Sequence, residues 1–131
     1  MNRIHVVAGV LVSGKLVLCA RRAEHKDLAG HWEFPGGKVD ANESPEDALV
    51  RELMEELQLI VANPFKLGET TTHSGANEIY IEFFRVDLAE PVELESTDHD
   101  SLIWLAPEEA MNLKWAPADI PIVNDLPALL A

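Results

Sequence analysis

Short apolar segments recur along this chain and predict the strands of a sheet. Ile4–Val12 and Lys15–Ala20 are rich in aliphatic residues, and Ser13-Gly14 between them is typical of a tight hairpin turn. The nearly continuous apolar character of both segments indicates burial on both faces of the sheet. Later apolar runs predict further strands at Leu59–Val61, Phe65–Leu67, Glu78–Leu88 and Leu102–Leu105.

An alternating pattern surrounds Glu33. Trp32 and Phe34 are expected to point into the core, so Glu33 between them faces the other way. Glu33 is then either an exposed side chain or a hydrogen-bond acceptor that contributes to ligand specificity. By contrast, Gly68–Asn77 is polar and contains glycine, and we expect it to be partly strand and partly loop.

Hydrophobic residues spaced by three and four predict a helix that begins near Pro45. Ser44 is a suitable N-cap, and proline is favoured at the first helical position because its missing N–H costs nothing there. Asp47, three residues after Ser44, approximates a capping box. The apolar stripe of this helix consists of Ala48, Leu49, Leu53, Met54 and Leu57.

Two further helices are predicted near the end of the sequence. One begins at Pro107 and covers the segment to Leu113, and the last begins at Asp119 or Pro121 and ends at about Leu130. Because strands come before, between and after the helices, the pattern predicts an α/β layered domain with a mixed sheet.

The polar face of the helix that begins at Pro45 carries a cluster of acidic side chains. Glu52, Glu55 and Glu56 are three and four residues apart, so their carboxylates are neighbours that repel one another. A hard divalent cation with oxygen ligands would offset this repulsion. A solvated acidic face is the alternative. We expect the Gly36-Gly37 pair just upstream to form an open turn beside this face, and the pair favours the cation, since glycine lets the backbone approach closely.

Composition and charge narrow the functional classes. The 131 residues are 47% hydrophobic, and we expect one domain over residues 1–131. A net charge of −13 argues against a nucleic-acid polymer as partner. No apolar run is long enough to suggest a membrane span. The single Cys19 excludes an internal disulfide, is best explained as a core residue, and fits a cytoplasmic protein. We expect a monomer or a homodimer.

The acidic helix and the glycine pair together resemble the Nudix box. The matching residues are Gly37, Glu43, Arg51, Glu52, Leu53, Glu55, Glu56 and Leu59, and every spacing fits. One position departs, because Gln58 stands where the family has glycine just past the helix end. Either Gln58 keeps a left-handed conformation at a strain of roughly 1 kcal/mol, or the helix ends differently.

The resemblance implies a fold and a metal site. The fold would be the Nudix α/β/α sandwich with a mixed, curved sheet. The cation would be Mg²⁺, with Mn²⁺ as a substitute. The implied ligands are the Gly36 carbonyl, Glu52, Glu55, Glu56 and a further acid, Asp98. Asp98 has an alternative interpretation as an ordinary acid of an acidic loop, whose short side chain does not reach the metal.

The resemblance also implies a catalytic set and a reaction. Glu52 would be the general base, oriented by an ion pair with Arg51, and Glu55 completes the catalytic set. Glu43 and Gly37 would support the loop. MutT-type members of the family hydrolyse a nucleoside triphosphate to the monophosphate and pyrophosphate, with attack at the β-phosphorus.

Substrate choice is expected at positions outside the acidic helix. Arg22 matches an arginine that contacts the nucleotide in MutT-type enzymes. Ala116–Pro121 resembles the segment that faces the base, and it is most similar to members acting on CTP, dCTP or 5-methyl-dCTP. An ionised Asp119, alone or together with Glu33, would only accept hydrogen bonds, which suits the amine of cytosine. Asp119 could instead serve simply as the N-cap of the last helix.

The sequence therefore predicts a Mg²⁺-dependent nucleoside triphosphate pyrophosphohydrolase that favours cytidine-type or modified nucleotides and sanitises the nucleotide pool. An 8-oxo-dGTP diphosphatase is an alternative, although such members often carry asparagine at the position of Asp119. A nucleotide sugar or dinucleotide is a third substrate class. From a different functional class, a non-catalytic nucleotide-sensing module is the remaining alternative, although no acid of the box is missing.

Overall fold

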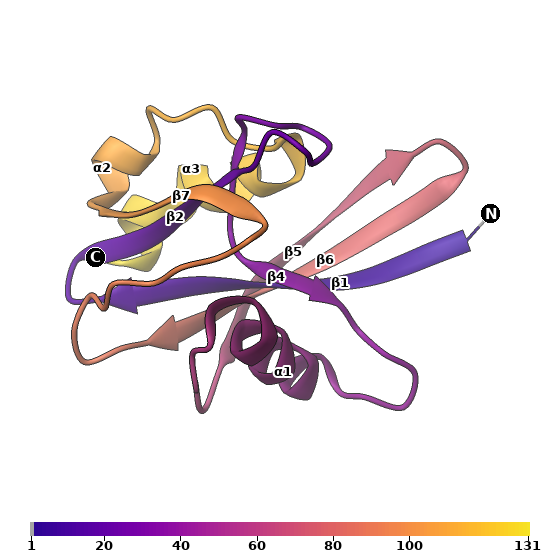
Figure 1. Ribbon diagram of the computed structural model, residues 1–131, viewed down its shortest axis with the longest axis horizontal. Coiled ribbons are helices and arrows are strands. Elements are labelled where there is room, and N and C mark those ends of the chain that lie inside the picture. The colour runs from indigo at the N-terminus through magenta and orange to yellow at the C-terminus, as the bar shows by residue number, and fades with distance from the viewer. Residues whose placement is uncertain (1) are drawn as a thin grey trace.

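A mixed sheet forms the centre of the computed structural model, which describes residues 2–131 (Figure 1). Seven strands belong to this sheet over the described residues. They are β1 (Asn2–Ser13), β2 (Leu16–Arg22), β3 (Trp32–Glu33), β4 (Gly36–Lys38), β5 (Phe65–Ser74), β6 (Asn77–Asp87) and β7 (His99–Leu105).

The long strand β1 organises the sheet. It pairs in parallel with β6 along Asn2–Val12, whereas its pairings with β2 and β4 are antiparallel. The main strand order is β3-β2-β1-β6-β5, and β7 pairs with β2. In Figure 1, the β2–β7 pair diverges from the ribbon formed by β1, β6 and β5. The β1–β2 hairpin is confirmed, with Gly14 at φ +59° in its turn.

Helices cover both faces of the sheet. α1 (Pro45–Leu57) lies on one face, while α2 (Pro107–Ala110), the 3₁₀ helix η1 (Pro117–Asp119) and α3 (Ile120–Leu129) lie on the other (Figure 1). The α/β/α arrangement with a mixed sheet is therefore confirmed. Within residues 2–131, none of the helices combines the length and the apolarity needed to cross a membrane.

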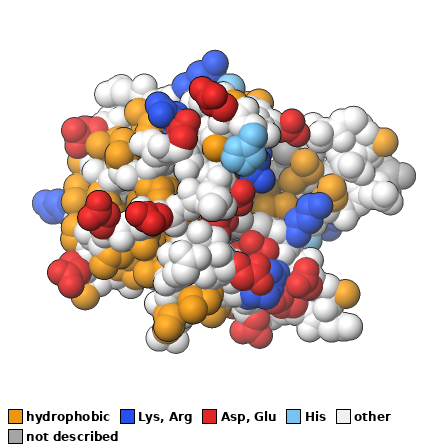
Figure 2. All heavy atoms as spheres, in the orientation of Figure 1, with side chains coloured by type: hydrophobic (Ala, Val, Ile, Leu, Met, Phe, Trp, Pro, Cys, Tyr) orange, Lys and Arg blue, Asp and Glu red, His pale blue; other side chains and the backbone are white. Residues whose placement is uncertain are grey.

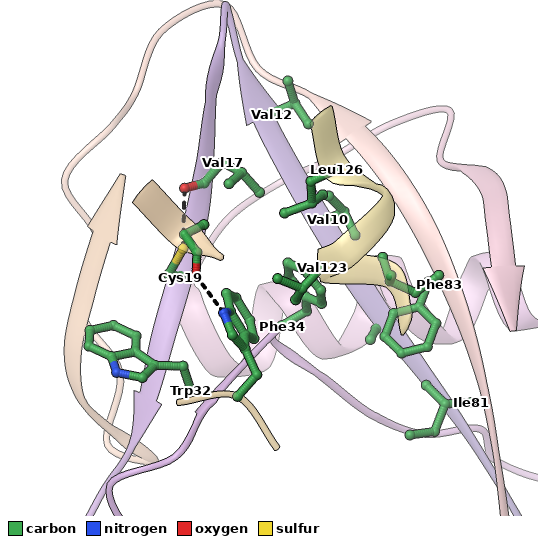
Figure 3. Close-up of a cluster of buried hydrophobic side chains, with 14 residues drawn as sticks. Val10, Val12, Val17, Cys19, Trp32, Phe34, Ile81, Phe83, Val123 and Leu126 are labelled. Carbon is green, nitrogen blue, oxygen red and sulfur yellow. Dashed lines mark hydrogen bonds between the residues drawn. The ribbon is translucent and has the colours of Figure 1, made fainter. Parts of the chain in front are cut away.

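Two hydrophobic clusters fill the space between the layers. Under α1, the buried residues of the helix pack on the odd-numbered side of β1, which includes Val7 and Leu11. On the opposite face, Val10 and Val12 point toward Val123 and Leu126 of α3 (Figure 3). β1 thus contributes to both clusters, which confirms that its continuous apolar character reflects burial on both faces. Cys19 is a buried free thiol in the second cluster, and burial raises its pKa to about 12.

Several local predictions are wrong. Leu59–Val61 forms no strand, and Ile60 is 81% exposed, because no neighbouring strand pairs with this short run. By contrast, the segment 68–77 is partly strand and partly turn, as predicted: β5 continues as far as Ser74, where its backbone pairs along β6, and Gly75 lies in the turn before β6. Met54 is 46% exposed rather than part of the apolar stripe, because it lies one helical step beyond Leu53.

The glycine pair and the later helix also differ from prediction. Gly36 and Gly37 form strand β4 against β1 instead of an open turn. α2 ends at Ala110, three residues before the predicted Leu113. A helix of four residues satisfies few of its own backbone groups, and loop contacts complete this one: the N–H groups of Asn112 and Leu113 donate to the carbonyls of Glu109 and Ala110.

Candidate active site

Both ends of α1 are fixed by local hydrogen bonds. Ser44 is the N-cap, and its Oγ accepts from the backbone N–H of Asp47 at 3.1 Å, as predicted. At the other end, Gln58 has φ 52° and ψ 35°, so it keeps the left-handed conformation in which glycine is favoured. The N–H of Leu59 donates to the Leu53 carbonyl at 3.2 Å and closes the helix. These ends set which face of α1 carries the glutamates.

Strand β4 brings its backbone against Glu52. A Cβ at Gly37 would lie 2.4 Å from Oε2 of Glu52, and a Cβ at Gly36 would lie 2.0 Å from the Val7 carbonyl oxygen. Both separations are too short for a side chain. The two glycines therefore allow β4 to lie between β1 and the acidic face of α1.

Arg51 is the centre of an ion-pair cluster on α1. Its guanidinium contacts Glu43 through Nε at 2.9 Å and through Nη2 at 3.0 Å, and Nη1 contacts Glu52 at 2.9 Å and Glu55 at 3.3 Å. The hydrogen bonds from Arg51 lower the pKa of Glu43 to about 2, and the same contacts raise the pKa of Arg51. Figure 2 shows acidic side chains gathered around a basic one over α1 and the preceding loop.

Glu56 has a different environment from the other two glutamates of the helix. Its side chain is only 9% exposed, and burial raises its pKa to about 7, even though the nearby His99 opposes this effect. His99 Nδ1 lies 3.2 Å from Glu56 Oε1. Glu56 therefore points inward, whereas Glu55 is on the exposed side of the helix.

A cavity of about 220 Å³ begins at Glu56 and the glycine strand. Its polar wall includes Arg22 and Glu33, joined by a contact of 2.7 Å between Nη1 and Oε1. Burial disfavours the ionised form of Glu33, but contacts from His99 and Arg22 outweigh this effect and lower its pKa. The complete lining is Val6, Ala8, Arg22, Lys26, Glu33, Phe34, Gly36, Gly37, Glu56, Ile81, Asp98 and Asp119.

Asp119 occupies the cavity wall far from α1 in sequence and is 6% exposed. Its Oδ2 accepts a hydrogen bond from the backbone N–H of Phe34 at 2.9 Å. Burial raises the pKa of Asp119 to about 7 despite this bond. Asp119 stands at the N-cap position of α3, as the alternative interpretation expected, but its side chain makes no capping bond to the helix, so capping does not account for the carboxyl. A substantial protonated fraction at neutral pH also changes the prediction of an acceptor-only group, because a neutral carboxyl both donates and accepts.

Asp98 also lines the cavity, where it forms an ion pair of 3.3 Å with Lys26. The structure therefore brings Asp98 and Glu56 to one cavity. Over residues 2–131, however, no three His, Cys, Asp or Glu side chains converge as a ready-made metal site. Glu52 and Glu56 instead contact Arg51 and His99.

A second, more open hollow of about 550 Å³ lies on the other side of Glu56. It is bordered by the end of α1, including Glu55 and Gln58, and by the acidic segment 93–102. The two hollows share Glu56.

One residue of the site had no sequence signal. His99 was predicted only as part of an acidic loop, yet it opens β7 and contacts acids from β3 and α1. A single histidine among acids, far from the motif, is indistinguishable in sequence from a surface residue. Alternation did predict that Glu33 faces away from the core, but it did not indicate Glu33's partners.

Fold and site together define an α/β/α domain in which an acidic helix, packed against a glycine strand, faces a cavity with an arginine and buried acids. The chain belongs to the NUDIX domain family, whose model matches residues 3–126. It is 37% identical to the CTP pyrophosphohydrolase of Escherichia coli over 131 residues, covering 100% of this chain and 96% of the relative.

Two further comparisons agree with this membership. A putative 8-oxo-dGTP diphosphatase 2 of Mycobacterium tuberculosis is 40% identical, with 96% of this chain and 89% of the relative covered. The solution structure of the E. coli ORF135 protein superposes with a TM-score of 0.85 at 36% identity, covering 100% of this chain and 93% of that one. The chain is accordingly a Nudix hydrolase, an enzyme that acts on phosphoric anhydride bonds. Nudix hydrolases act on small nucleotide substrates and generally use a divalent metal.

Proposed function

We propose that this chain is a Mg²⁺-dependent nucleoside triphosphate pyrophosphohydrolase that favours cytidine-type or modified nucleotides and sanitises the cytoplasmic nucleotide pool. One observation carries the proposal: a single cavity is lined both by Glu56 of the acidic helix and by the buried Asp119. A nucleotide that presents its phosphates to the helix can therefore present its base to Asp119. The E. coli relative named CTP pyrophosphohydrolase supports the cytidine assignment.

The residues present fit a hard divalent cation. Their donors are all oxygens, and the buried Glu56 carboxylate with its raised pKa is a group that a cation would stabilise. The Gly36 carbonyl, Glu52, Glu55 and Glu56 would hold Mg²⁺, and Asp98 borders the same cavity. When bound, the cation would neutralise phosphate charge and activate the attacking water.

The groups of the chain itself have distinct roles in the proposed reaction. Glu52 accepts a proton from the attacking water as general base, and Arg51 holds its carboxylate through the contact of 2.9 Å. Glu43 fixes Arg51 from the opposite side with two hydrogen bonds. The water oxygen forms a bond to the β-phosphorus, and the α,β-bridging oxygen leaves with the monophosphate. Pyrophosphate therefore carries the new oxygen.

Arg22 is proposed to bind the nucleotide. Hydrogen bonds within residues 2–131 engage its Nε with the Asp27 carbonyl and its Nη1 with Glu33. Nη2 remains for a substrate phosphate, which guanidinium groups recognise with fixed geometry. Glu33 uses one oxygen for Arg22 and the other for His99, so its main contribution is to position Arg22, and only its remaining lone pairs are available to a base.

Asp119 is proposed to read the base. With Oδ2 accepting from Phe34 N–H, a protonated Oδ1 can donate to the ring nitrogen N3 of cytosine while the carboxyl also accepts from the exocyclic amine. The raised pKa makes this protonated form available near neutral pH. The carboxyl thus acts like an amide.

The same observation favours a second candidate, an 8-oxo-dGTP diphosphatase. An amide-like carboxyl also matches a purine edge that donates through N1–H and accepts through O6. The M. tuberculosis relative named putative 8-oxo-dGTP diphosphatase 2 supports this candidate. The two candidates differ in the ranking of substrates and share the reaction.

Pyrophosphate release from a nucleotide panel tests the proposal. The panel contains CTP, dCTP, 5-methyl-dCTP, 8-oxo-dGTP, the ordinary triphosphates and ADP-ribose, each with Mg²⁺, compared by kcat/KM. Cytidine-type nucleotides should rank first. Asp119→Ala, which removes both the donor and the acceptor, should change the ratio of kcat/KM between nucleotides by about 10-fold or more, because one lost base contact is worth about 1–3 kcal/mol. Asp125→Ala, at an exposed acid on α3, is the matched control.

Each alternative outcome has a definite meaning. First rank for 8-oxo-dGTP would replace the cytidine assignment with the second candidate. First rank for ADP-ribose would indicate the dinucleotide class. Nucleotide binding without turnover would support a sensing module, and an unchanged ranking in Asp119→Ala would remove Asp119 from base recognition.

A further inference from the structure

His99 lines the more open hollow, and it contacts Glu33 and Glu56, which line the cavity. Its side chain is 0% exposed, and each ring nitrogen lies near an acid. Nε2 is 2.7 Å from Glu33 Oε2, while Nδ1 is 3.2 Å from Glu56 Oε1 and 3.0 Å from Ser96 Oγ. A buried polar ring with partners at both nitrogens has one fixed orientation.

The neighbours of His99 extend this contact into a chain that crosses the site. Glu33 in turn accepts a hydrogen bond from Arg22 Nη1 at its other oxygen, Oε1, over 2.7 Å. Arg22, Glu33, His99 and Glu56 come from β2, β3, β7 and α1, respectively. One end of the chain is the proposed phosphate-binding arginine, and the other end is a carboxylate of the acidic helix.

A β-bulge in β7 adjoins His99 and orients its side chain. Arg22 pairs with His99 and Arg21 pairs with Ser101, so β7 contributes one extra residue, Asp100, at this point. The extra residue bonds to Arg21 at the exposed surface with a distance of 2.6 Å. Because successive strand side chains alternate, the bulge sends Asp100 outward and His99 inward.

We propose that His99 is a positioning residue that couples the acidic, metal-binding helix to the nucleotide-binding side of the cavity. The proposal rests on the function proposed above for Glu56 and Arg22. His99 holds Glu56 through Nδ1, and it holds Arg22 through Glu33 and Nε2. His99 thereby links groups at the two ends of the site, and each of its contacts supports ligand binding at its own end.

Two variants that each keep half of the bridge test this coupling. A glutamine amide reaches approximately the place of Nε2, so His99→Gln keeps the contact with Glu33. An asparagine amide lies approximately at the place of Nδ1, so His99→Asn keeps the contact with Glu56. His73→Asn, on the exposed part of β5, is the control.

The readouts are binding measurements that need no turnover. Mn²⁺ binding is followed by electron paramagnetic resonance without nucleotide. Nucleotide binding is followed calorimetrically with EDTA, using a CTP analogue whose α,β-bridging oxygen is replaced by a methylene group. His99→Gln should keep nucleotide affinity and lose about 10-fold or more in Mn²⁺ affinity, as is typical for loss of an outer partner of a metal ligand. His99→Asn should show the opposite pattern.

The controls separate this inference from the proposed function. Wild-type protein that binds neither Mn²⁺ nor the analogue would reject the proposed function and the coupling with it. Wild-type protein that binds both, with both variants unchanged, would overturn the coupling alone. Parallel loss of both affinities in both variants, with a matching fall in Tm, would reduce His99 to a structural residue and also overturn it.

Discussion

Asp119 shows how a single buried carboxyl gains its properties from residues far away in sequence. Phe34 supplies the backbone donor that fixes its orientation, and the surrounding core removes most of its contact with water. The second effect is larger, so the pKa rises to about 7. A residue expected to act only as an acceptor therefore has a protonated form near neutral pH.

Asp119→Asn should stabilise the protein more at pH 8 than at pH 5. The carboxyl has a pKa of 3.8 when unperturbed and about 7 in the folded state. Between these values the folded state binds more protons, so the contribution of Asp119 to stability is fully present below pH 4 and is lost as the pH rises through 7. An amide does not titrate. The unfolding free energy of the variant minus that of the wild type should therefore be about 2 kcal/mol larger at pH 8 than at pH 5.

Thermal or urea unfolding of both proteins at pH 5 and pH 8 measures this effect. Any constant cost of the amide cancels in the comparison, because it is the same at both pH values. A difference in unfolding free energy that is equal at pH 5 and pH 8 would contradict the raised pKa of Asp119.

At the scale of the element, α1 combines predictable and unpredictable features. Ser44 and Pro45 define its beginning in sequence, and the structure agrees. The spacing of Glu52, Glu55 and Glu56 also placed them correctly on one helix. Their different environments were not predictable, because exposure of Glu55 and burial of Glu56 depend on β7.

The C-terminal end of α1 gives a prediction about stability. Gln58 has φ 52°, a left-handed conformation that costs a side chain roughly 1 kcal/mol relative to glycine. Gln58→Gly should therefore raise the free energy of unfolding by up to about 1 kcal/mol, less the small contribution of the exposed Gln58 Nε2 bond to the Glu55 carbonyl.

Urea unfolding of wild type, Gln58→Gly and Gln58→Ala separates the two effects. Alanine keeps the unfavourable backbone conformation and removes the side-chain bond, so it should be the least stable of the three. A glycine variant less stable than alanine would show that the left-handed conformation carries no strain.

At the scale of the whole molecule, the periodicity of the sequence predicted the layers and the motif predicted the acidic helix. The pairing of β1 with β6 in parallel joins segments about seventy-five residues apart, as in Asn2 with Asn77, and no local pattern specifies it. The contacts of His99 have the same origin. Glu33 and Glu56 meet it only because three strands and a helix converge there. Sequence patterns thus predicted the position of the glutamates on α1 better than the surroundings of these glutamates.

The central claim is that Glu52 is the general base of a reaction in which water attacks the β-phosphorus of a nucleoside triphosphate. Glu52→Gln keeps the size of the side chain and removes the base. Glu46→Gln, an exposed acid in the first turn of α1, is the matched control for loss of charge. Circular dichroism and Tm establish that each variant is folded.

The most direct measurement is hydrolysis of CTP with Mg²⁺ in ¹⁸O-labelled water, with both products analysed by mass spectrometry. Wild type and Glu46→Gln should release pyrophosphate that carries the label and cytidine monophosphate that does not. Glu52→Gln should remain folded and turn over about 10²–10⁴-fold more slowly, the usual contribution of a general base. Label in the monophosphate, or wild-type turnover in Glu52→Gln, would contradict the account.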